Sequence, residues 1–170
     1  HIVSISHDQV SAAIGAGAFD SSVAVDGAGT VECVTPIYDS IPDIEAMYDG
    51  YFSIVPYVIP GKYVAYAFSY TGGALIQWCV DNLAKDEKRA AADRDLSVNE
   101  YLEKKYATER GEENPSNLLI LPHFAGAATP YMDTGSKGAI LGLTIDTTVA
   151  DIYRGCMEGV VYEMLVNTSA

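Results

Sequence analysis

The stretch GAILGLTIDTTVADIYRGCMEG, residues 138–159, decides the fold class of this chain of 170 residues. Its first six residues are small or apolar and predict a short extended segment at 138–143. Thr148 and Asp151 have the spacing of a capping box, in which each side chain bonds the other residue's backbone N–H at a helix start. Apolar residues then follow on one side of the predicted helix: Val149, Ile152, Cys156, Met157, Val160, Val161 and Met164. A strand that leads into a long amphipathic helix predicts an α/β protein.

Further strands are predicted upstream of this stretch. Apolar and β-branched runs predict strands that we expect to find in one sheet, at 1–5, 22–25, 30–36 and 62–69. Turn residues at 26–29 predict a hairpin, and Pro60-Gly61 predicts a second one between 51–59 and 62–69. A short buried strand is expected at 118–121.

Helices are predicted at 9–15 and 72–84, from a small-residue run and from apolar spacing. We expect the helix that begins near Gly73 and the one that begins near Thr148 to pack on the faces of the sheet. Residues 85–117 are the most polar part of the chain. Within them, Ser97 and Glu100 have capping-box spacing and predict one more helix.

Composition restricts the function classes. The formal net charge of −13 repels the phosphates of nucleic acids, and no apolar run reaches the length of a membrane span. Cys33, Cys79 and Cys156 lie in apolar contexts without metal-ligand spacing, so we expect buried thiols in a reducing, cytoplasmic compartment. No nucleic acid, membrane or metal site is therefore expected.

The chain opens on His1 and an apolar run, without an initiator Met or a basic segment. That opening is neither a signal peptide nor a natural start, so we expect a longer protein that has been cut within a strand.

Four blocks, taken together, resemble the FGGY family of carbohydrate kinases. Residues 138–158 are similar to its C-terminal signature in the spacing from GL at 142–143 to DI at 151–152 and in the closing Glu158. LPHFAGAATPYMD at 121–133 is similar to the family loop Pro-x-x-x-Gly-x-x-(Thr/Ala)-Pro-x-x-Asp. HDQ at 7–9 followed by GT at 29–30, and GGALIQW at 72–78, resemble its sugar, phosphate and nucleotide contacts. The chain departs from the family at Gly155, where Ala or Ser is usual, and at Ala127-Ala128, where its pentulose kinases have Glu-Arg.

The resemblance implies a ribonuclease H-like, actin-like ATPase fold, with a central mixed sheet and flanking helices, truncated in this chain. Residues 1–35 would end an N-terminal or interdomain segment that carries the catalytic Asp. Residues 36–170 would form part of the C-terminal kinase domain, with a variable polar insertion at about 85–117. The implied reaction moves the γ-phosphoryl group of ATP, with Mg²⁺, onto a sugar or polyol hydroxyl, and a homodimer is allowed. By the resemblance, the family's N-terminal domain with its Asp-x-Gly-(Thr/Ser) phosphate loop would lie before His1 and its Gly-rich adenosine loop after Ala170, so we expect the chain alone to be inactive.

Asp8 has two interpretations. From spacing alone, an Asp between a strand and a helix is more often an N-cap than a catalytic acid. The resemblance makes Asp8 the carboxylate that accepts the proton of the sugar hydroxyl during phosphoryl transfer. By the same resemblance Gln9 would bind a neighbouring hydroxyl, against the alternative of an exposed helix residue.

Four further residues are candidate nucleotide contacts. Gly29 and Thr30 would hold phosphate through a backbone N–H and a hydroxyl, and the alternative is an ordinary hairpin turn. Gly73 and Gln77 lie one helical turn apart and would flank the nucleotide. For Gly73 the alternative is close packing of a helix. Asp151 and Glu158 share a helix face, and we favour a structural role for them over a metal site.

Three functions remain open from the sequence. The first is an ATP-dependent sugar or polyol kinase of which this chain is a part. The second is a non-catalytic actin-like domain that binds a ligand or partner, and the third is a stand-alone acidic α/β binding domain. The residues that flank this segment in its gene would discriminate among them.

Overall fold

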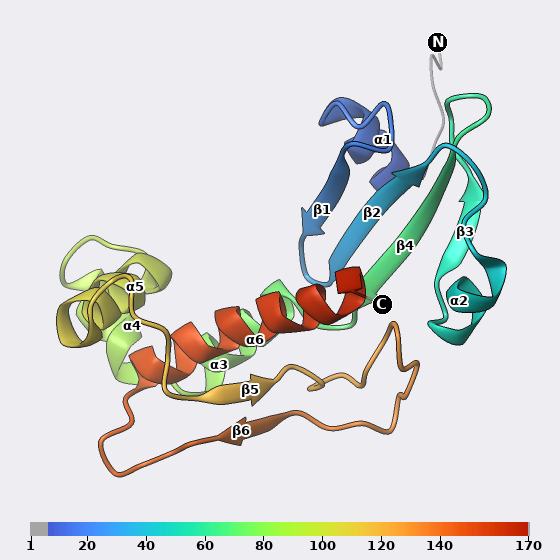
Figure 1. The fold of residues 1–170 in the computed structure, drawn as a ribbon. Coiled ribbons are helices and arrows are strands. Elements are labelled where there is room, and N and C mark those ends of the chain that lie inside the picture. Colours follow the sequence, from blue (N-terminus) through green and yellow to red (C-terminus); the bar gives the residue numbers. More distant parts are fainter. Residues whose placement is uncertain (1–6, 170) are drawn as a thin grey trace.

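The computed structural model describes residues 7–169 and confirms the α/β class (Figure 1). A four-stranded sheet lies beside a group of helices, and one long helix runs between them. The strand predicted at 1–5 lies outside the described residues. Within the described part of the chain, no helix combines the length and apolarity needed to cross a membrane.

The sheet has the strand order β1-β2-β4-β3, which corresponds to Ala24–Ala28, Glu32–Tyr38, Tyr63–Ser69 and Ser53–Pro56. Its three pairings are antiparallel, where the resemblance implied a mixed sheet. Short turns join β1 to β2 and β3 to β4, and such turns permit only antiparallel pairing. The boundary expected at residue 35 falls within β2 and stays a prediction.

The first hairpin turns later than predicted. Asp26, Gly27 and Ala28 belong to β1, and the turn is made by residues 29–31, where the Gly29 N–H donates to the Val31 carbonyl (3.1 Å). At Gly27 the Gln9 side chain approaches the strand closely, since a Cβ there would lie 2.7 Å from Oε1 of Gln9. The Asp-Gly pair therefore marks a close approach of α1 to the strand and not the turn itself.

A helix covers each face of the sheet. On one face α1 (Asp8–Gly15) packs Val10 and Ala13 against Ile37 and Val64. On the opposite face α6 (Val149–Ser169) packs Met164 against β2 and β4. Successive side chains of a strand point to opposite faces of the sheet. The paired residues of β2 and β4 therefore face α1 and α6 alternately.

The second half of the fold is helical. The helices α3 (Gly73–Asn82) and α5 (Val98–Arg110) pack against the N-terminal part of α6 and share one apolar core with it, and α4 (Lys85–Ala92) packs against α5 and α3. The predicted capping boxes at Ser97 and Thr148 are both formed. The prediction that α3 packs on the sheet is wrong. The chain leaves β4 at the end of the sheet, and α3 extends away from it beside α6 and α4 (Figure 1).

Two helices have weak sequence signals and were not predicted. Asp43 caps α2 (Ile44–Asp49) by accepting the N–H groups of Glu45 (2.9 Å) and Ala46 (3.3 Å). α4 occupies part of the polar stretch at 85–117 and buries only Ala91. With one buried apolar residue, α4 has no apolar periodicity from which it could have been predicted.

A short ribbon packs against α6. It consists of β5 (Leu119–Leu121) and β6 (Ala139–Leu141), which pair antiparallel at two predicted extended segments. The strand at β5 was predicted to be buried, but within it only Ile120 is buried, because one face of the ribbon packs on α6. The helix approaches this ribbon through two glycines. A Cβ at Gly159 would lie 2.5 Å from the Ile120 carbonyl oxygen, whereas a Cβ at Gly155 would first meet the Ile120 side chain, at 3.1 Å.

These two glycines give a matched pair of substitutions. Gly159→Ala should destabilise the protein by about 1–3 kcal/mol, because a backbone carbonyl cannot rotate away from the new methyl group. Gly155→Ala should change stability by less than about 1 kcal/mol, since the flexible end of Ile120 can move and alanine favours the helix. Urea unfolding followed by circular dichroism measures both. Equal losses for the two variants would contradict this packing of α6.

Candidate active site

The turn after β1 crosses the start of α3. The N–H of Gly73 donates to the Gly29 carbonyl (2.7 Å), and the N–H groups of Gly72 and Ala74 donate to the Thr30 carbonyl (both 3.1 Å). A Cβ at Gly73 would lie 2.8 Å from the Gly29 oxygen, so only glycine permits this approach. The N–H of Gly73 is therefore bonded within the protein, and glycine at this position lets α3 approach the turn closely, which is the helix packing given as the alternative to a nucleotide contact.

All four candidate nucleotide contacts meet at this crossing. Gly29, Thr30, Gly73 and Gln77 are solvent-exposed and line one hollow of about 610 Å³. A volume of several hundred cubic ångströms is typical of small-molecule sites. The sequence separates the two pairs by more than forty residues, and the fold places them on one surface.

The rest of the hollow is formed by Ala74, Trp78 and Asp81. Gln77 Nε2 donates to Asp81 Oδ2 (2.9 Å), and Lys88 Nζ donates to Asp81 Oδ1 (2.7 Å). These bonds, that from Lys88 first, lower the pKa of Asp81 below its ordinary value. Trp78 packs edge-on against Phe124, with ring centroids 4.7 Å apart. The surface thus combines an indole, an amide and a fixed carboxylate beside two glycines.

Sequence reasoning missed Asp81. It lies four residues after Gln77 and therefore on the same helix face. This spacing could have predicted that Asp81 lies beside Gln77.

Asp8 lies on a different element, in the first turn of α1. Its side chain is 88% exposed and its Oδ1 accepts the N–H of Gln9 (2.8 Å). His7 occupies the cap position and makes no side-chain cap bond. Asp8 therefore accepts one of the N–H groups that an N-cap would satisfy, although it does so from the first helical position, and a capping role stays an alternative to a functional one.

Gln9 is half-buried and is not the exposed helix residue that was the alternative. Its amide lies over Gly27 of β1, and its Oε1 is buried without a hydrogen-bond partner. The structure thus places Asp8 and Gln9 together on α1, and it places the four nucleotide candidates together at the start of α3.

Comparison with known proteins identifies the family. The family model for the C-terminal domain of the FGGY family of carbohydrate kinases matches residues 28–166. The chain belongs to the FGGY family of carbohydrate kinases. It is 27% identical over 168 residues to a glycerol kinase from Citrifermentans bemidjiense, covering 97% of this chain and 31% of that protein. It is 24% identical over 157 residues to a xylulose kinase from Lactococcus lactis, covering 92% of this chain and 28% of that protein.

Solved structures of FGGY kinases share the fold. Xylulose kinase from Rhodospirillum rubrum superposes with a TM-score of 0.76 at 18% identity, over 96% of this chain and 30% of that one. Plasmodium falciparum glycerol kinase with ADP gives a TM-score of 0.67 at 21% identity, over 95% of this chain and 30% of that one. The actin-like ATPase fold that the resemblance implied is therefore confirmed, as a partial domain. The chain spans about a third or less of the length of these relatives.

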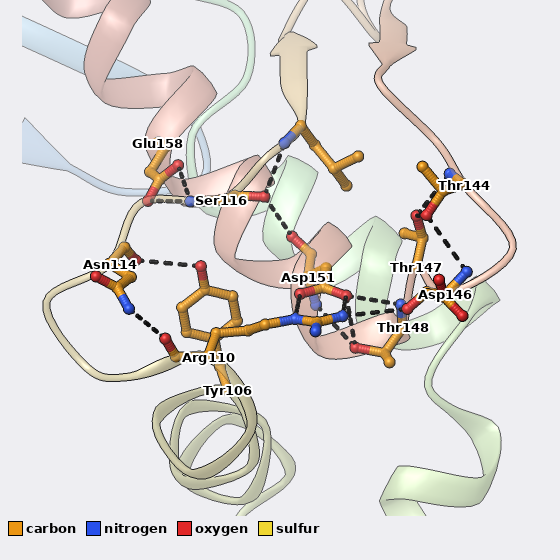
Figure 2. A network of polar contacts seen from close by, with 11 residues as sticks. Tyr106, Arg110, Asn114, Ser116, Thr144, Asp146, Thr147, Thr148, Asp151 and Glu158 are labelled. Atoms are coloured by element: carbon orange, nitrogen blue, oxygen red, sulfur yellow. Dashed lines mark hydrogen bonds and ion pairs between the residues drawn. The ribbon is translucent and has the colours of Figure 1, made fainter.

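The FGGY signature residues on α6 are held by protein donors (Figure 2). Arg110 binds Asp151 through two hydrogen bonds, Nε to Oδ1 (2.9 Å) and Nη2 to Oδ2 (3.0 Å). Thr148 completes the capping box on the same carboxylate. Glu158 accepts the backbone N–H of Ser116 (3.0 Å) and the Nε of Arg154 (2.7 Å). In the described structure the Asp151 carboxylate ties the start of α6 to Arg110 at the end of α5, and the Glu158 carboxylate ties α6 to Ser116 in the segment that leads into β5, which fits the structural role that the sequence favoured.

The Arg110 pair makes stability dependent on pH. Arg110 first, and then the Thr148 bonds, hold the pKa of Asp151 at about 2, against an ordinary value of 3.8. A depressed carboxyl pKa contributes stability that is full above the ordinary value and is lost as pH falls through the folded-state value.

Arg110→Gln should therefore lower the free energy of unfolding by about 1–2 kcal/mol at pH 7. The difference from wild type should shrink as pH falls from about 4 toward 2, as Asp151 becomes protonated. Thermal melts across this range measure it. Arg89→Gln, which breaks an exposed pair with Asp86, is the control and should have little effect. A loss at Arg110 that is the same at pH 7 and pH 2 would contradict the assignment.

Proposed function

We propose that this chain supplies part of the active site of an ATP-dependent kinase that phosphorylates a hydroxyl group of a sugar or polyol. The observation that supports it most is the meeting of Gly29, Thr30, Gly73 and Gln77 around one exposed hollow. The same residues that resemble the FGGY nucleotide contacts in sequence are neighbours in space. The chain covers about 30% of the length of related kinases, and we propose that other parts of the site are contributed by residues outside it.

ATP is the proposed phosphoryl donor. The adenosine part would occupy the hollow along α3, where Gln77, Trp78 and Asp81 offer an amide, a ring and a carboxylate. The phosphates would lie at the turn, where no side chain at Gly29 obstructs their approach and the Thr30 hydroxyl can donate. Mg²⁺ would arrive with the nucleotide, because it is commonly held by phosphate oxygens and water with only one or two carboxylates. Its role would be to neutralise charge on the phosphates.

Asp8 is the proposed general base. Its exposed carboxylate can reach a substrate hydroxyl, accept its proton and orient the oxygen toward the γ-phosphorus. The new bond joins that oxygen to phosphorus, the bond to the bridging oxygen of ADP breaks, and the proton remains on Asp8. Gln9 is the proposed neighbouring substrate contact.

The relatives suggest the acceptor class. Glycerol kinases and xylulose kinases are both among the similar proteins, so glycerol and pentuloses are the first acceptors to test. We also propose a cytoplasmic location, because Cys33, Cys79 and Cys156 are all free and buried. A homodimer remains compatible with this function.

Asp8→Asn in the full-length protein should lower kcat by about 10²–10⁴, since the amide keeps the size of the side chain but cannot accept the proton. KM for ATP should stay close to wild type, and the melting temperature should change little because Asp8 is exposed. Steady-state kinetics with the best acceptor, beside the exposed surface variant Asp86→Asn, measure this. If Asp8→Asn retains most of the wild-type kcat, Asp8 is not the base.

The 170-residue chain by itself should bind Mg-ATP weakly or not at all and should transfer no phosphoryl group. The reason is that the hollow at the start of α3 is open and presents only one side of a nucleotide site. Isothermal titration calorimetry with Mg-ATP tests this expectation. Micromolar affinity of the isolated chain would show that the proposed nucleotide site is misplaced.

A further inference from the structure

Glu32 is a buried carboxyl group beside the candidate phosphate turn. It is the first residue of β2, two positions after Thr30, and is only 7% exposed. Its Oε2 lies against Gly72, where an added Cβ would be 2.7 Å away. The carboxyl group therefore packs directly behind the crossing of the turn and α3.

Glu32 also lines a second hollow, of about 230 Å³, that shares Gly29 and Gly73 with the nucleotide hollow. The other walls come from three elements: Ala28 of β1, Ile76 of α3, and Met157 and Val160 of α6. These walls are apolar. A charge on Glu32 would consequently be poorly solvated and close to any anion held at the turn.

The surroundings of Glu32 contain one other acidic group. Asp26 projects from the same face of the β1–β2 hairpin, since the register pairs Ala28 with Glu32 and Asp26 with Val34. The facing positions on β4, α3 and α6 are Ser69, Gly72, Gly73, Ile76, Met157 and Val160, none of which carries a charge. Burial first, and then Asp26, raise the pKa of Glu32 to about 7. The carboxyl group can therefore gain or lose its proton near neutral pH.

We propose that Glu32 is a positioning residue whose protonation is coupled to phosphate binding at the turn formed by residues 29–31. This inference rests on the proposed function. An anion at the turn disfavours the charged form of Glu32, so binding of the phosphates is accompanied by uptake of a proton from solvent onto Glu32. By linkage, lower pH strengthens nucleotide binding and higher pH weakens it.

The size of the effect follows from linkage. If the bound phosphates raise the pKa of Glu32 by roughly one unit, Kd for the nucleotide should increase about fivefold between pH 6 and pH 8. Glu32→Gln removes the titrating group and keeps its shape and hydrogen-bonding capacity. Asp26→Asn removes the like charge, so it should lower the pKa of Glu32 and move the transition to lower pH.

The experiment is isothermal titration calorimetry of Mg-ATP with the full-length protein at pH 6, 7 and 8, in buffers of different ionisation enthalpy. Wild type should take up a fraction of a proton near pH 7 and lose affinity as pH rises. Glu32→Gln should take up less and show a flatter profile, while Glu45→Gln, an exposed carboxyl group on α2, should match wild type. Comparing variants in this way cancels the titration of the nucleotide itself.

A melting series without nucleotide shows whether Glu32→Gln folds and whether Glu32 titrates. A carboxyl pKa that is raised on folding makes the protein lose stability as pH rises toward 7, so Glu32→Gln should melt higher than wild type at pH 8 and not at pH 5. Equal pH dependence of Kd in wild type and Glu32→Gln, or none in wild type, would overturn the coupling and leave the kinase proposal standing. Absence of ATP binding at every pH would refute the proposed function and this inference with it.

Discussion

The bonds between the turn at residues 29–31 and the first turn of α3 are the constraint on which the candidate site depends. Three consecutive N–H groups, those of Gly72, Gly73 and Ala74, bind the carbonyls of Gly29 and Thr30. A side chain at either Gly72 or Gly73 would collide with the opposite segment. Because the N–H groups at a helix start have no partner within the helix, the turn also completes the hydrogen bonding of α3. One contact thus fixes the sheet, the helix and the hollow relative to one another.

α6 connects the sheet to the helical half of the fold. Its C-terminal part packs Met164 on the sheet, and its N-terminal part packs Cys156 and Tyr153 into the helical core. Polar contacts fasten it at both ends. The Asp151 and Glu158 bonds hold its start (Figure 2), and a buried pair of Glu163 with His123 (3.1 Å) ties its later turns to the loop that follows β5. His123 also contacts Ser136 (2.8 Å), so both ends of that loop are held.

Much of this could be predicted from local chemistry. The capping boxes at Ser97 and Thr148 and the Pro60-Gly61 hairpin depend on residues close in sequence, and each formed as predicted. The errors concern interactions between distant segments. Gly27 suggested a turn because nothing local reveals that Gln9 packs over it. Likewise Arg110 gave no signal of its pairing with Asp151, forty-one positions away. That Gly29 and Gly73 belong to one site was suggested only by the family resemblance. Spacing along the chain contains no information about the crossing of the turn and α3.

The central claim is that the nucleotide occupies the hollow at the crossing. One competitor within the described structure is a hollow of about 360 Å³ between α5 and α6, lined by residues that include Tyr106, Tyr153 and Arg154. Photolabelling of the full-length protein with an azido-adenine analogue of ATP, followed by peptide mapping, distinguishes them directly. The account predicts that, within this chain, the label attaches to the segment from Gly73 to Asp81 and that excess ATP prevents it. Label that instead attaches to α5 or to the first half of α6, and is equally prevented by ATP, would contradict it.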